Sequence, residues 1–230
     1  MTSDIYSDGT YLAANPGWHS EHSRWKAAQC QALLSELRLE PSSICDVGCG
    51  AGGVLARLGE AYPQAKLSGF DPSVAAIQMA QRDHPAIDFA VGEVEGEFDL
   101  VLVMDVIEHV EDCFGFVRGL RPHADVLLIH IPLELSCFYL WRNVLMTNRR
   151  HLGHIHYFTR DTALALLTDA GFEILADRYT PSYVDHAARD PKSRVVTAIQ
   201  RAGFRLAPDR SSVLIGGYSL LVAARPLRER

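Results

Sequence analysis

The stretch Asp46-Val47-Gly48-Cys49-Gly50-Ala51-Gly52-Gly53 follows the short apolar run Ser43-Ile44-Cys45 and leads into the helix-like segment 54–58. A second apolar run ends at Asp71, 25 residues after Asp46. A glycine-rich turn lets the backbone approach a ligand closely at the carboxyl end of a strand. An acidic side chain that ends the next strand can accept hydrogen bonds from both ribose hydroxyls. The stretch therefore predicts a strand, a turn and a helix that bind a nucleoside.

Two kinds of nucleoside cofactor fit this turn. Gly48, Gly50 and Gly53 satisfy the G-x-G-x-x-G pattern of dinucleotide-binding proteins. The carboxylate of Asp46, two residues before the first glycine, would face the pyrophosphate of a dinucleotide, and close like charges repel. S-adenosylmethionine presents an ammonium group and a sulfonium where NAD has its phosphates. Asp46 therefore favours S-adenosylmethionine.

The same residues carry a resemblance to a known family. The chain resembles the class I S-adenosylmethionine-dependent methyltransferases, and the segments 98–103 and 105–110 look like the fourth strand of that family and its "EHV" segment. The first motif of the family, D-x-G-x-G-x-G, is matched by Asp46, Gly48, Gly50 and Gly52.

A second signature points to one branch of the family. His154-Ile155-His156-Tyr157-Phe158-Thr159, with Gly171-Phe172 after the next helix, resembles the "H-x-H-x-F-T … GF" pattern of small-molecule enzymes such as the ubiquinone-biosynthesis-type methyltransferases. The resemblance covers roughly residues 18–175 and the last strand. Its motifs are specific for cofactor and fold, and less so for substrate.

The order of apolar segments predicts an α/β fold. Strands that alternate with helices form a parallel sheet with helices on both faces. The resemblance implies a Rossmann-like doubly wound sheet, mostly parallel, with an antiparallel last strand. We expect strands at 43–47, 66–70, 87–91, 98–104, 124–131, 172–176 and 213–222, and helices at about 19–38, 52–61, 73–82, 111–119 and 159–170.

The resemblance also assigns roles at the cofactor site. Asp46 is expected near the ammonium group of S-adenosylmethionine, Asp71 on both ribose hydroxyls, and Glu93 near adenine N6, where the family usually has Asp. The full set of expected cofactor contacts is Asp46, Gly48, Cys49, Gly50, Asp71, Pro72, Glu93, Val94, Met104 and Asp105.

Methyl transfer needs few catalytic groups, because the sulfonium is already an activated leaving group. The protein aligns the acceptor, excludes water and, for a hydroxyl acceptor, removes a proton. Histidine suits that task because it titrates near neutrality. His154 and His156 are the first candidates for the base and His109 is the third. The alternative for each is a structural hydrogen bond.

One methyltransferase domain is expected over residues 1–230, with an N-terminal helical cover at 1–40 over cofactor and acceptor and a lid at 133–158 over the acceptor. Residues 181–210 are expected to form a helical insert, with a partly disordered loop as the alternative. Phe138, Trp141 and Tyr157 are candidate acceptor contacts in the lid, which can also be read as an ordinary core helix. Tyr11 and Trp18 are candidates in the cover, where packing against the sheet edge is the alternative.

Composition narrows the partners. The 230 residues carry a formal net charge of −6 at pH 7 and the pI is about 5.9, so there is no broad basic footprint for nucleic acid. Five cysteines without a C-x-x-C pair argue against a disulfide framework and fit a reducing cytoplasm. Without a signal-peptide pattern or a long apolar run, we expect no membrane partner. A homodimer is left open.

The sequence also bears on metal binding and on two rival functions. His151, His154 and His156 have a spacing that could suit Zn²⁺, but no acidic or thiolate fourth ligand can be placed, so we expect no metal. An NAD-dependent reductase is disfavoured by Asp46 and by the lack of a well-placed Tyr-x-x-x-Lys. A non-catalytic S-adenosylmethionine-binding protein is the third possibility. The favoured function is methylation of a small-molecule acceptor, with oxygen favoured because of the histidines.

Overall fold

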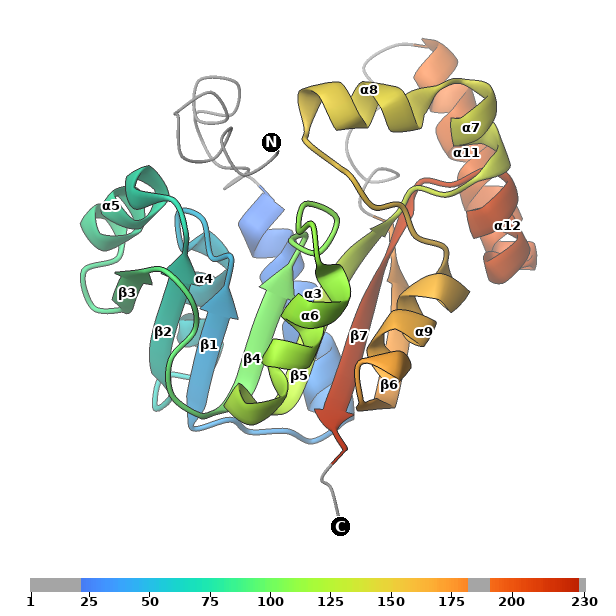
Figure 1. Ribbon diagram of the computed structural model, residues 1–230. Coiled ribbons are helices and arrows are strands. Elements are labelled where there is room, and N and C mark those ends of the chain that lie inside the picture. Colours follow the sequence, from blue (N-terminus) through green and yellow to red (C-terminus); the bar gives the residue numbers. More distant parts are fainter. Residues whose placement is uncertain (1–21, 182–190, 228–230) are drawn as a thin grey trace.

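The computed structural model describes residues 22–181 and 191–227, and one seven-stranded sheet runs through them (Figure 1). The strand order is β3-β2-β1-β4-β5-β7-β6. All neighbouring strands are parallel except β7, which is antiparallel to both β5 and β6. The expected doubly wound, mostly parallel fold is therefore confirmed. The strands are β1 (Ser43–Val47), β2 (Lys66–Asp71), β3 (Asp88–Val91), β4 (Phe98–Met104), β5 (Ala124–Leu133), β6 (Phe172–Thr180) and β7 (Tyr218–Pro226).

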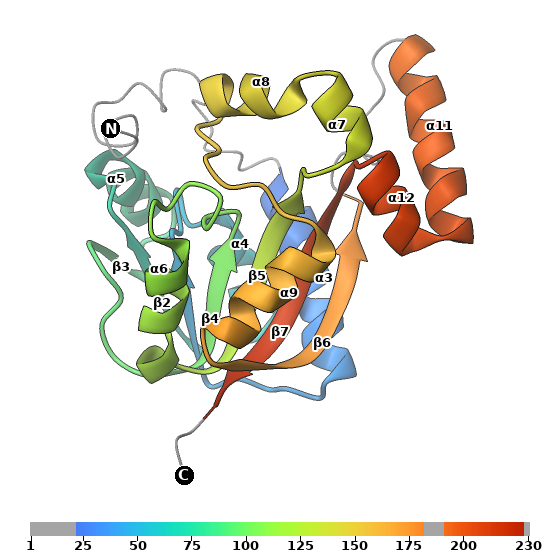
Figure 2. The ribbon, with the colours of Figure 1, turned by 45° about the vertical axis from the view of Figure 1, so that its right-hand side comes forward.

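Helices cover both faces of this sheet, as Figures 1 and 2 show. Apolar side chains such as Ile44 and Leu102 pack on one face under α3, α4 and α5. Their neighbours in the strands, such as Cys45 and Val103, pack on the other face under α6 and α9. Because these strands are buried on both faces, their sequences are continuous apolar runs and do not alternate with polar residues. The helices are α3 (Ser23–Glu36), α4 (Gly53–Ala61), α5 (Val74–Asp83), α6 (Cys113–Gly119), α7 (Cys137–Trp141), α8 (Val144–His151), α9 (Arg160–Asp169), α11 (Pro191–Leu206) and α12 (Pro208–Leu214), with a 3₁₀ turn at Arg121–His123.

The last strand was predicted at the wrong place. We expected a strand over 213–222, whereas α12 extends to Leu214 and β7 begins at Tyr218. Gly216 and Gly217 have φ of 74° and 91°, and this left-handed backbone separates the helix from the strand. The apolar letters before the glycines therefore belong to the end of a helix, which periodicity over a short run cannot distinguish from a strand.

The sixth strand is longer than expected. It continues beyond 176 to Thr180 and carries a bulge between Ile174 and Ala176. Asp177 and Arg178 interrupt the apolar pattern, but the carboxylate of Asp177 accepts two hydrogen bonds from Arg160, each 2.8 Å long. Polar side chains paired in this way can remain in a strand at the edge of the sheet.

Four helices lie where the lid and the insert were expected. α7 and α8 fall within 133–158, and α11 and the beginning of α12 fall within 181–210. Figures 1 and 2 show these four helices gathered at one corner of the molecule, beyond the ends of β5, β7 and β6. We call them the helical cap. In the described part of the chain, no helix combines the length and hydropathy needed to cross a membrane.

Candidate active site

The glycine-rich turn lies at the carboxyl ends of β1 and β2. The backbone N–H groups of Gly48 and Cys49 both donate to the carbonyl oxygen of Phe70, at 2.7 and 3.1 Å. The carboxylate of Asp71 then accepts from Gly50 N–H at 2.9 Å and from Ser73 N–H at 2.8 Å. Asp71 is thus held in place by backbone donors, and its remaining lone pairs can still accept from a ribose.

The surroundings of Gly48 explain why the first position of the motif is a glycine. Its φ is 76°, and a Cβ placed there would lie 2.5 Å from a methyl carbon of Val106. Only glycine satisfies both the left-handed backbone and this close approach. The contact also brings the loop that follows β4 against the turn that follows β1, so the residues from 105 onward lie beside the expected methionine end of the cofactor.

Asp46 is buried and one of its oxygens is unsatisfied. The side chain is 2% exposed, and Oδ1 has no hydrogen-bond partner among the described residues. Burial raises the pKa of Asp46 to about 7, Lys26 opposes the rise and Asp71 adds to it. A buried carboxylate oxygen without a donor is costly. This oxygen therefore fits the ammonium group that S-adenosylmethionine would place here.

A network of charged groups fixes the end of β4. The carboxylate of Asp105 accepts from Lys26 Nζ at 2.7 Å and lies 2.5 Å from His130 Nδ1. The other ring nitrogen of His130 lies 2.8 Å from the hydroxyl of Thr180. Although burial acts to raise the pKa of Asp105, the charges of His130 and Lys26 and their hydrogen bonds hold it well below its usual range. Asp105 therefore carries a negative charge, and its φ of 60° is a left-handed backbone that this network stabilises.

The other expected cofactor contacts lie around the same edge. Gly92 N–H donates to the carbonyl of Asp71 at 3.1 Å, and this bond holds the segment with exposed Glu93 and half-buried Val94 beside Asp71. Met104 is buried, with its sulfur 3.8 Å from Cys30 Sγ. Cys49 is buried within the turn, whereas Pro72 is exposed.

His154 is the histidine whose surroundings suit a base. It is 6% exposed, and its Nδ1 lies 2.9 Å from Oε2 of Glu134, which is itself 2% exposed. Asn148 of α8 donates to the other oxygen of Glu134 at 2.6 Å. A carboxylate only accepts hydrogen bonds, so Nδ1 carries the hydrogen and Nε2 keeps its lone pair. The pair therefore has the arrangement of a base with an orienting acid.

Glu108 and His109 lie next to this pair. The His109 and His154 rings meet edge to face with centroids 4.8 Å apart. Glu108 is 1% exposed, and neither of its oxygens has a hydrogen-bond partner within the described residues, although His109 Nε2 lies 3.9 Å from Oε1. Burial, and then the charges of Asp105 and Glu134, raise the pKa of Glu108 well above its ordinary value. Ligand-type atoms of Glu108, His109 and His154 lie within 4.8 Å of one another. The cluster differs from the set considered from sequence, because His151 is exposed at the end of α8.

His156 and Tyr157 are used in holding the backbone. His156 Nε2 lies 2.8 Å from the carbonyl of Val110 and 3.2 Å from that of Glu111, so it serves as a donor. The Tyr157 hydroxyl lies 3.0 Å from the carbonyls of both Leu145 and His154. Of the two first candidates for the base, the geometry therefore favours His154.

The residues proposed to contact the acceptor differ in how exposed they are. Phe138 is half-buried, with Arg142 over its ring at 5.7 Å, whereas Trp141 is 81% exposed. The core-packing alternative does not hold for Trp141, and its side chain lies mostly in solvent. Tyr11 and Trp18 lie outside the described residues.

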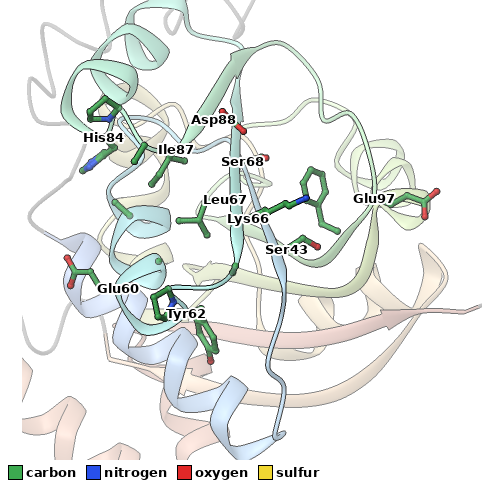
Figure 3. Close-up of a pocket in the computed structure, with 17 residues that line it drawn as sticks. Ser43, Glu60, Tyr62, Lys66, Leu67, Ser68, His84, Ile87, Asp88 and Glu97 are labelled. Atoms are coloured by element: carbon green, nitrogen blue, oxygen red, sulfur yellow. The ribbon is translucent and has the colours of Figure 1, made fainter.

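A hollow of about 710 Å³ lies elsewhere, along the amino ends of the strands (Figure 3). Its lining includes Ser43 and Lys66, which begin β1 and β2, together with Glu60, Asp88 and Glu97. Ligands of doubly wound sheets bind at the carboxyl ends of the strands. This hollow therefore lies at the opposite edge from the glycine-rich turn and plays no part in the site.

Four residues of the site were not predicted from the sequence: Lys26, His130, Glu134 and Asn148. Each reaches the site through tertiary structure, and none belongs to a recognisable motif. The apolar run of β5 contained a signal for two of them, since His130 and Glu134 are the polar letters in and just after that run. A polar side chain in a strand buried on both faces needs a partner.

Comparisons with known proteins agree with this geometry. The fold and the site define a class I S-adenosylmethionine-dependent methyltransferase, with S-adenosylmethionine as its cofactor. A family model described as a methyltransferase domain matches residues 20–177, more than half of the chain, and the chain belongs to this family.

Curated relatives differ in the acceptor they use. The ubiquinone biosynthesis O-methyltransferase of Methylobacterium nodulans is 42% identical over 96 residues, which cover 36% of this chain and 36% of that protein. The match thus spans about a third of that relative. The trans-aconitate 2-methyltransferase of Streptomyces avermitilis is 26% identical over 68% of this chain and 72% of its own. The norajmaline N-methyltransferase of Rauvolfia serpentina is 29% identical over 56% of this chain and 51% of its own.

Solved structures share the fold. The magnesium protoporphyrin IX methyltransferase of Synechocystis PCC 6803, with bound SAH, has a TM-score of 0.59 at 19% identity, and the alignment covers 88% of this chain and 83% of that one. A putative methyltransferase in complex with the Haloferax volcanii Trm112 activator has a TM-score of 0.65 at 14% identity, covering 97% and 96%.

Proposed function

We propose that this methyltransferase transfers the methyl group to a hydroxyl oxygen of a small-molecule acceptor in a biosynthetic pathway. The observation that carries the proposal is the buried pair of His154 and Glu134, because a hydroxyl acceptor must lose a proton and an amine that arrives deprotonated need not. When bound, S-adenosylmethionine supplies an activated methyl group on a sulfonium. The curated O-methyltransferase relatives support the same acceptor atom.

His154 would take the acceptor proton at Nε2. Glu134 accepts the Nδ1 hydrogen, which fixes the tautomer and favours the imidazolium that forms. Asn148 holds the second oxygen of Glu134, and Tyr157 ties the carbonyl of His154 to that of Leu145. Because Asn148 and Leu145 lie on α8, the lid helix and the base are positioned together.

The base lies one short loop from the expected methionine end of the cofactor. Ile155 N–H and His156 N–H donate to the carbonyl of Glu108 at 2.8 and 3.1 Å. The loop from 105 to 110 contacts the glycine-rich turn through Val106 and Gly48. An acceptor between these two segments would have the base on one side and the methyl group on the other, which is the arrangement that proximity requires.

The proposed reaction needs no metal ion. The competing possibility is that Glu108, His109 and His154 hold a divalent ion, which would use the same histidine that we assign as the base. Turnover should therefore survive EDTA within about twofold, since general-base catalysis by His154 needs only the side chain. Loss of turnover on chelation, with recovery on adding one metal, would replace the base by a metal-bound acceptor.

The direct test is transfer of the methyl group from radiolabelled S-adenosylmethionine to a panel of phenols, catechols, sugars, carboxylic acids and amines. Labelled alkyl methyl ethers or aryl methyl ethers are the expected products. Label found only on nitrogen, or only on carboxylates, would reject O-methylation of a hydroxyl. Binding of S-adenosylhomocysteine without turnover on any acceptor would support a non-catalytic role, and tight binding of NAD would support a reductase.

A further inference from the structure

Charge is distributed unevenly between the helical cap and the rest of the chain. The cap segments 137–151 and 191–214 contain eight basic residues and one acidic residue, a formal net charge of +7. The remaining residues contain 14 basic and 27 acidic residues, a net charge of −13. The overall charge of −6 therefore conceals a strongly basic region. The basic side chains that the structure places in solvent are Arg142, Arg149, Arg150, Arg201, Arg205 and Arg210.

The same helices expose large hydrophobic side chains. Over the described residues, eight of the twelve large hydrophobic side chains that are exposed lie in the cap. Six of them are between 53% and 87% exposed, and one is the cap's tryptophan. Exposed apolar side chains that gather on one region usually mark an interaction surface. These six are Leu140, Trp141, Val195, Ile199, Leu206 and Leu214.

The exposure follows from how α11 docks. Phe204 stacks on Tyr218 of β7 with ring centroids 4.1 Å apart, and Gln200 donates to the carbonyl of Gly216 at 3.2 Å. In a helix of 3.6 residues per turn, Val195 and Leu206 lie on one side and Phe204 lies roughly half a turn away. The docked face of α11 is thus fixed by the sheet, and its apolar outer face has no partner in the described residues.

The four helices of the cap are packed together. A Cβ on Gly216, in the turn after α12, would lie 2.7 Å from the hydroxyl of Ser136 and 3.2 Å from the Tyr139 ring of α7. A Cβ on Gly203 of α11 would lie 2.8 Å from Ser211 of α12. Close packing at these two places joins α11 and α12 to α7, and α8 follows α7 directly (Figure 2).

We propose that the helical cap binds the surface of an anionic membrane. Helices that combine exposed arginines with Trp, Leu, Ile and Val lie in the interface plane, with apolar side chains among the lipid tails and basic groups on the headgroups. This binding is peripheral and needs no spanning helix. It goes beyond the proposed function and replaces the sequence-based expectation of no membrane partner, which rested on the lack of a signal-peptide pattern and of a long apolar run.

Two other occupants fit the surface less well. A twofold dimer through the cap would bring the same patch of each copy together, so +7 would face +7 across an apolar contact. A nucleic acid would use the arginines and leave the exposed leucines, isoleucine and valine unused, since its binding sites depend on charge and on stacking. An anionic lipid surface uses both kinds of side chain.

The test is co-sedimentation of the full chain with vesicles. We expect the partition coefficient on vesicles with about 30% phosphatidylglycerol in phosphatidylcholine to exceed that on pure phosphatidylcholine by at least about tenfold at roughly 0.1 M salt. Raising the salt to about 0.5 M should reduce binding because it shortens the Debye length.

Matched pairs of variants locate the surface. Leu206→Ser/Leu214→Ser and Arg149→Glu/Arg150→Glu should each lower the partition coefficient at least about fivefold. Val74→Ser/Val91→Ser removes similarly exposed apolar side chains from α5 and β3, and Arg82→Glu/Arg118→Glu changes the net charge equally on α5 and α6. These two controls should bind vesicles like the parent. All four variants should bind S-adenosylhomocysteine normally, which shows that they are folded.

Several results would overturn the proposal. Equal binding to both kinds of vesicle, no binding to either, or equal losses in cap and control variants would each reject it. So would a dimer in sedimentation equilibrium that Leu206→Ser/Leu214→Ser dissociates. Tight binding of an RNA oligonucleotide that depends on Arg149 and Arg150, with no vesicle binding, would assign the surface to a nucleic acid instead.

Discussion

The edge of the sheet that carries the proposed cofactor residues and the helical cap are built in opposite ways. At the proposed cofactor edge, Asp46 and Asp71 are buried, and the backbone N–H groups of Gly50 and Ser73 hold the carboxylate of Asp71. In the cap, side chains such as Trp141 and Leu206 lie in solvent, and the helices are joined by a few close contacts. The cofactor edge is therefore specified by local backbone geometry, whereas the exposed side chains of the cap are not constrained by a local motif.

The largest effect is expected at His154, where the two regions meet. His154→Ala should lower the rate of the chemical step about 10²–10⁴-fold, because a positioned general base contributes that much. Affinity for S-adenosylhomocysteine should stay within about twofold, since no cofactor residue is changed. Single-turnover kinetics and titration calorimetry measure the two quantities separately. Glu134→Gln should give a smaller loss in rate, because it removes only the charge that orients the ring.

His156→Ala is the matched control for that prediction. It removes hydrogen bonds to the carbonyls of Val110 and Glu111, so it should lower the melting temperature while the chemical rate changes little. An unchanged rate in His154→Ala, or an equal loss in both variants, would mean that neither histidine is the base. Proximity alone would then have to account for catalysis.

The next effect concerns the cofactor edge. Asp71→Ala should weaken S-adenosylhomocysteine binding by about 1.5–3 kcal/mol, which is roughly 10- to 150-fold, since hydrogen bonds to a charged group have that strength. The variant also frees the N–H groups of Gly50 and Ser73, which adds to the loss. Asp88→Ala, at an exposed position that begins β3, is the control and should bind normally. Unchanged affinity in Asp71→Ala would show that the ribose binds elsewhere.

The pKa of Asp46 predicts a pH dependence of cofactor binding. Burial raises this pKa to about 7, and an ammonium group binds the ionised form. Affinity for S-adenosylhomocysteine should therefore fall roughly tenfold per pH unit below about 7 and level off above it. Asp46→Asn should remove the slope. Calorimetry between pH 5 and about 8.5 provides the measurement, and an equal slope in the Asn variant would assign the titration to another group.

The same group affects stability without cofactor. A carboxyl whose pKa is raised in the folded state binds more protons there than in the unfolded chain. The contribution of Asp46 to the free energy of unfolding is therefore largest at low pH. It is lost as pH rises from about 4 toward 7, where the folded protein must bury a charge. The ligand-free Asp46→Asn variant should accordingly gain melting temperature over the parent at pH 8 and little at pH 5.

The smallest effect is expected in the cap. Leu206 is 87% exposed, so Leu206→Ser should change the free energy of unfolding by no more than about 0.5 kcal/mol. Leu102 of β4 is fully buried, and Leu102→Ala should cost roughly 2–5 kcal/mol. Urea unfolding of both variants measures the contrast. A large loss in Leu206→Ser would show that its side chain packs against part of the molecule.

The two regions also differ in how well the sequence predicts them. β1 and β4 were expected at their observed bounds, because both are apolar runs beside a motif with fixed geometry. The glycine turn and Asp71 meet at the same edge for the same reason. The network of Lys26, Asp105 and His130 could not be predicted, since its members come from α3, β5 and the residue after β4. Their meeting depends on helix and strand packing, which periodicity does not specify.

The end of the chain shows a further limit. The strand expected at 213–222 begins five residues late, because apolar letters on both sides of Gly216 and Gly217 conceal a helix end. His154 was named as a candidate base from its motif. Its partner Glu134 was not, because it is 20 residues away in sequence, and neither was Asn148, which donates to Glu134 from α8.

The antiparallel strand β7 has a consequence for synthesis of the protein. β7 lies between β5 and β6, and 37 residues separate the end of β6 from its beginning. On the ribosome, β6 therefore emerges before β7, which is its neighbour in the sheet. The edge of β5 that pairs with β7 stays unpaired for even longer. Nascent chains that stall before residue 218 expose two unpaired strand edges, which are templates for aggregation. Chaperone binding during translation should accordingly peak between the emergence of β6 and that of β7.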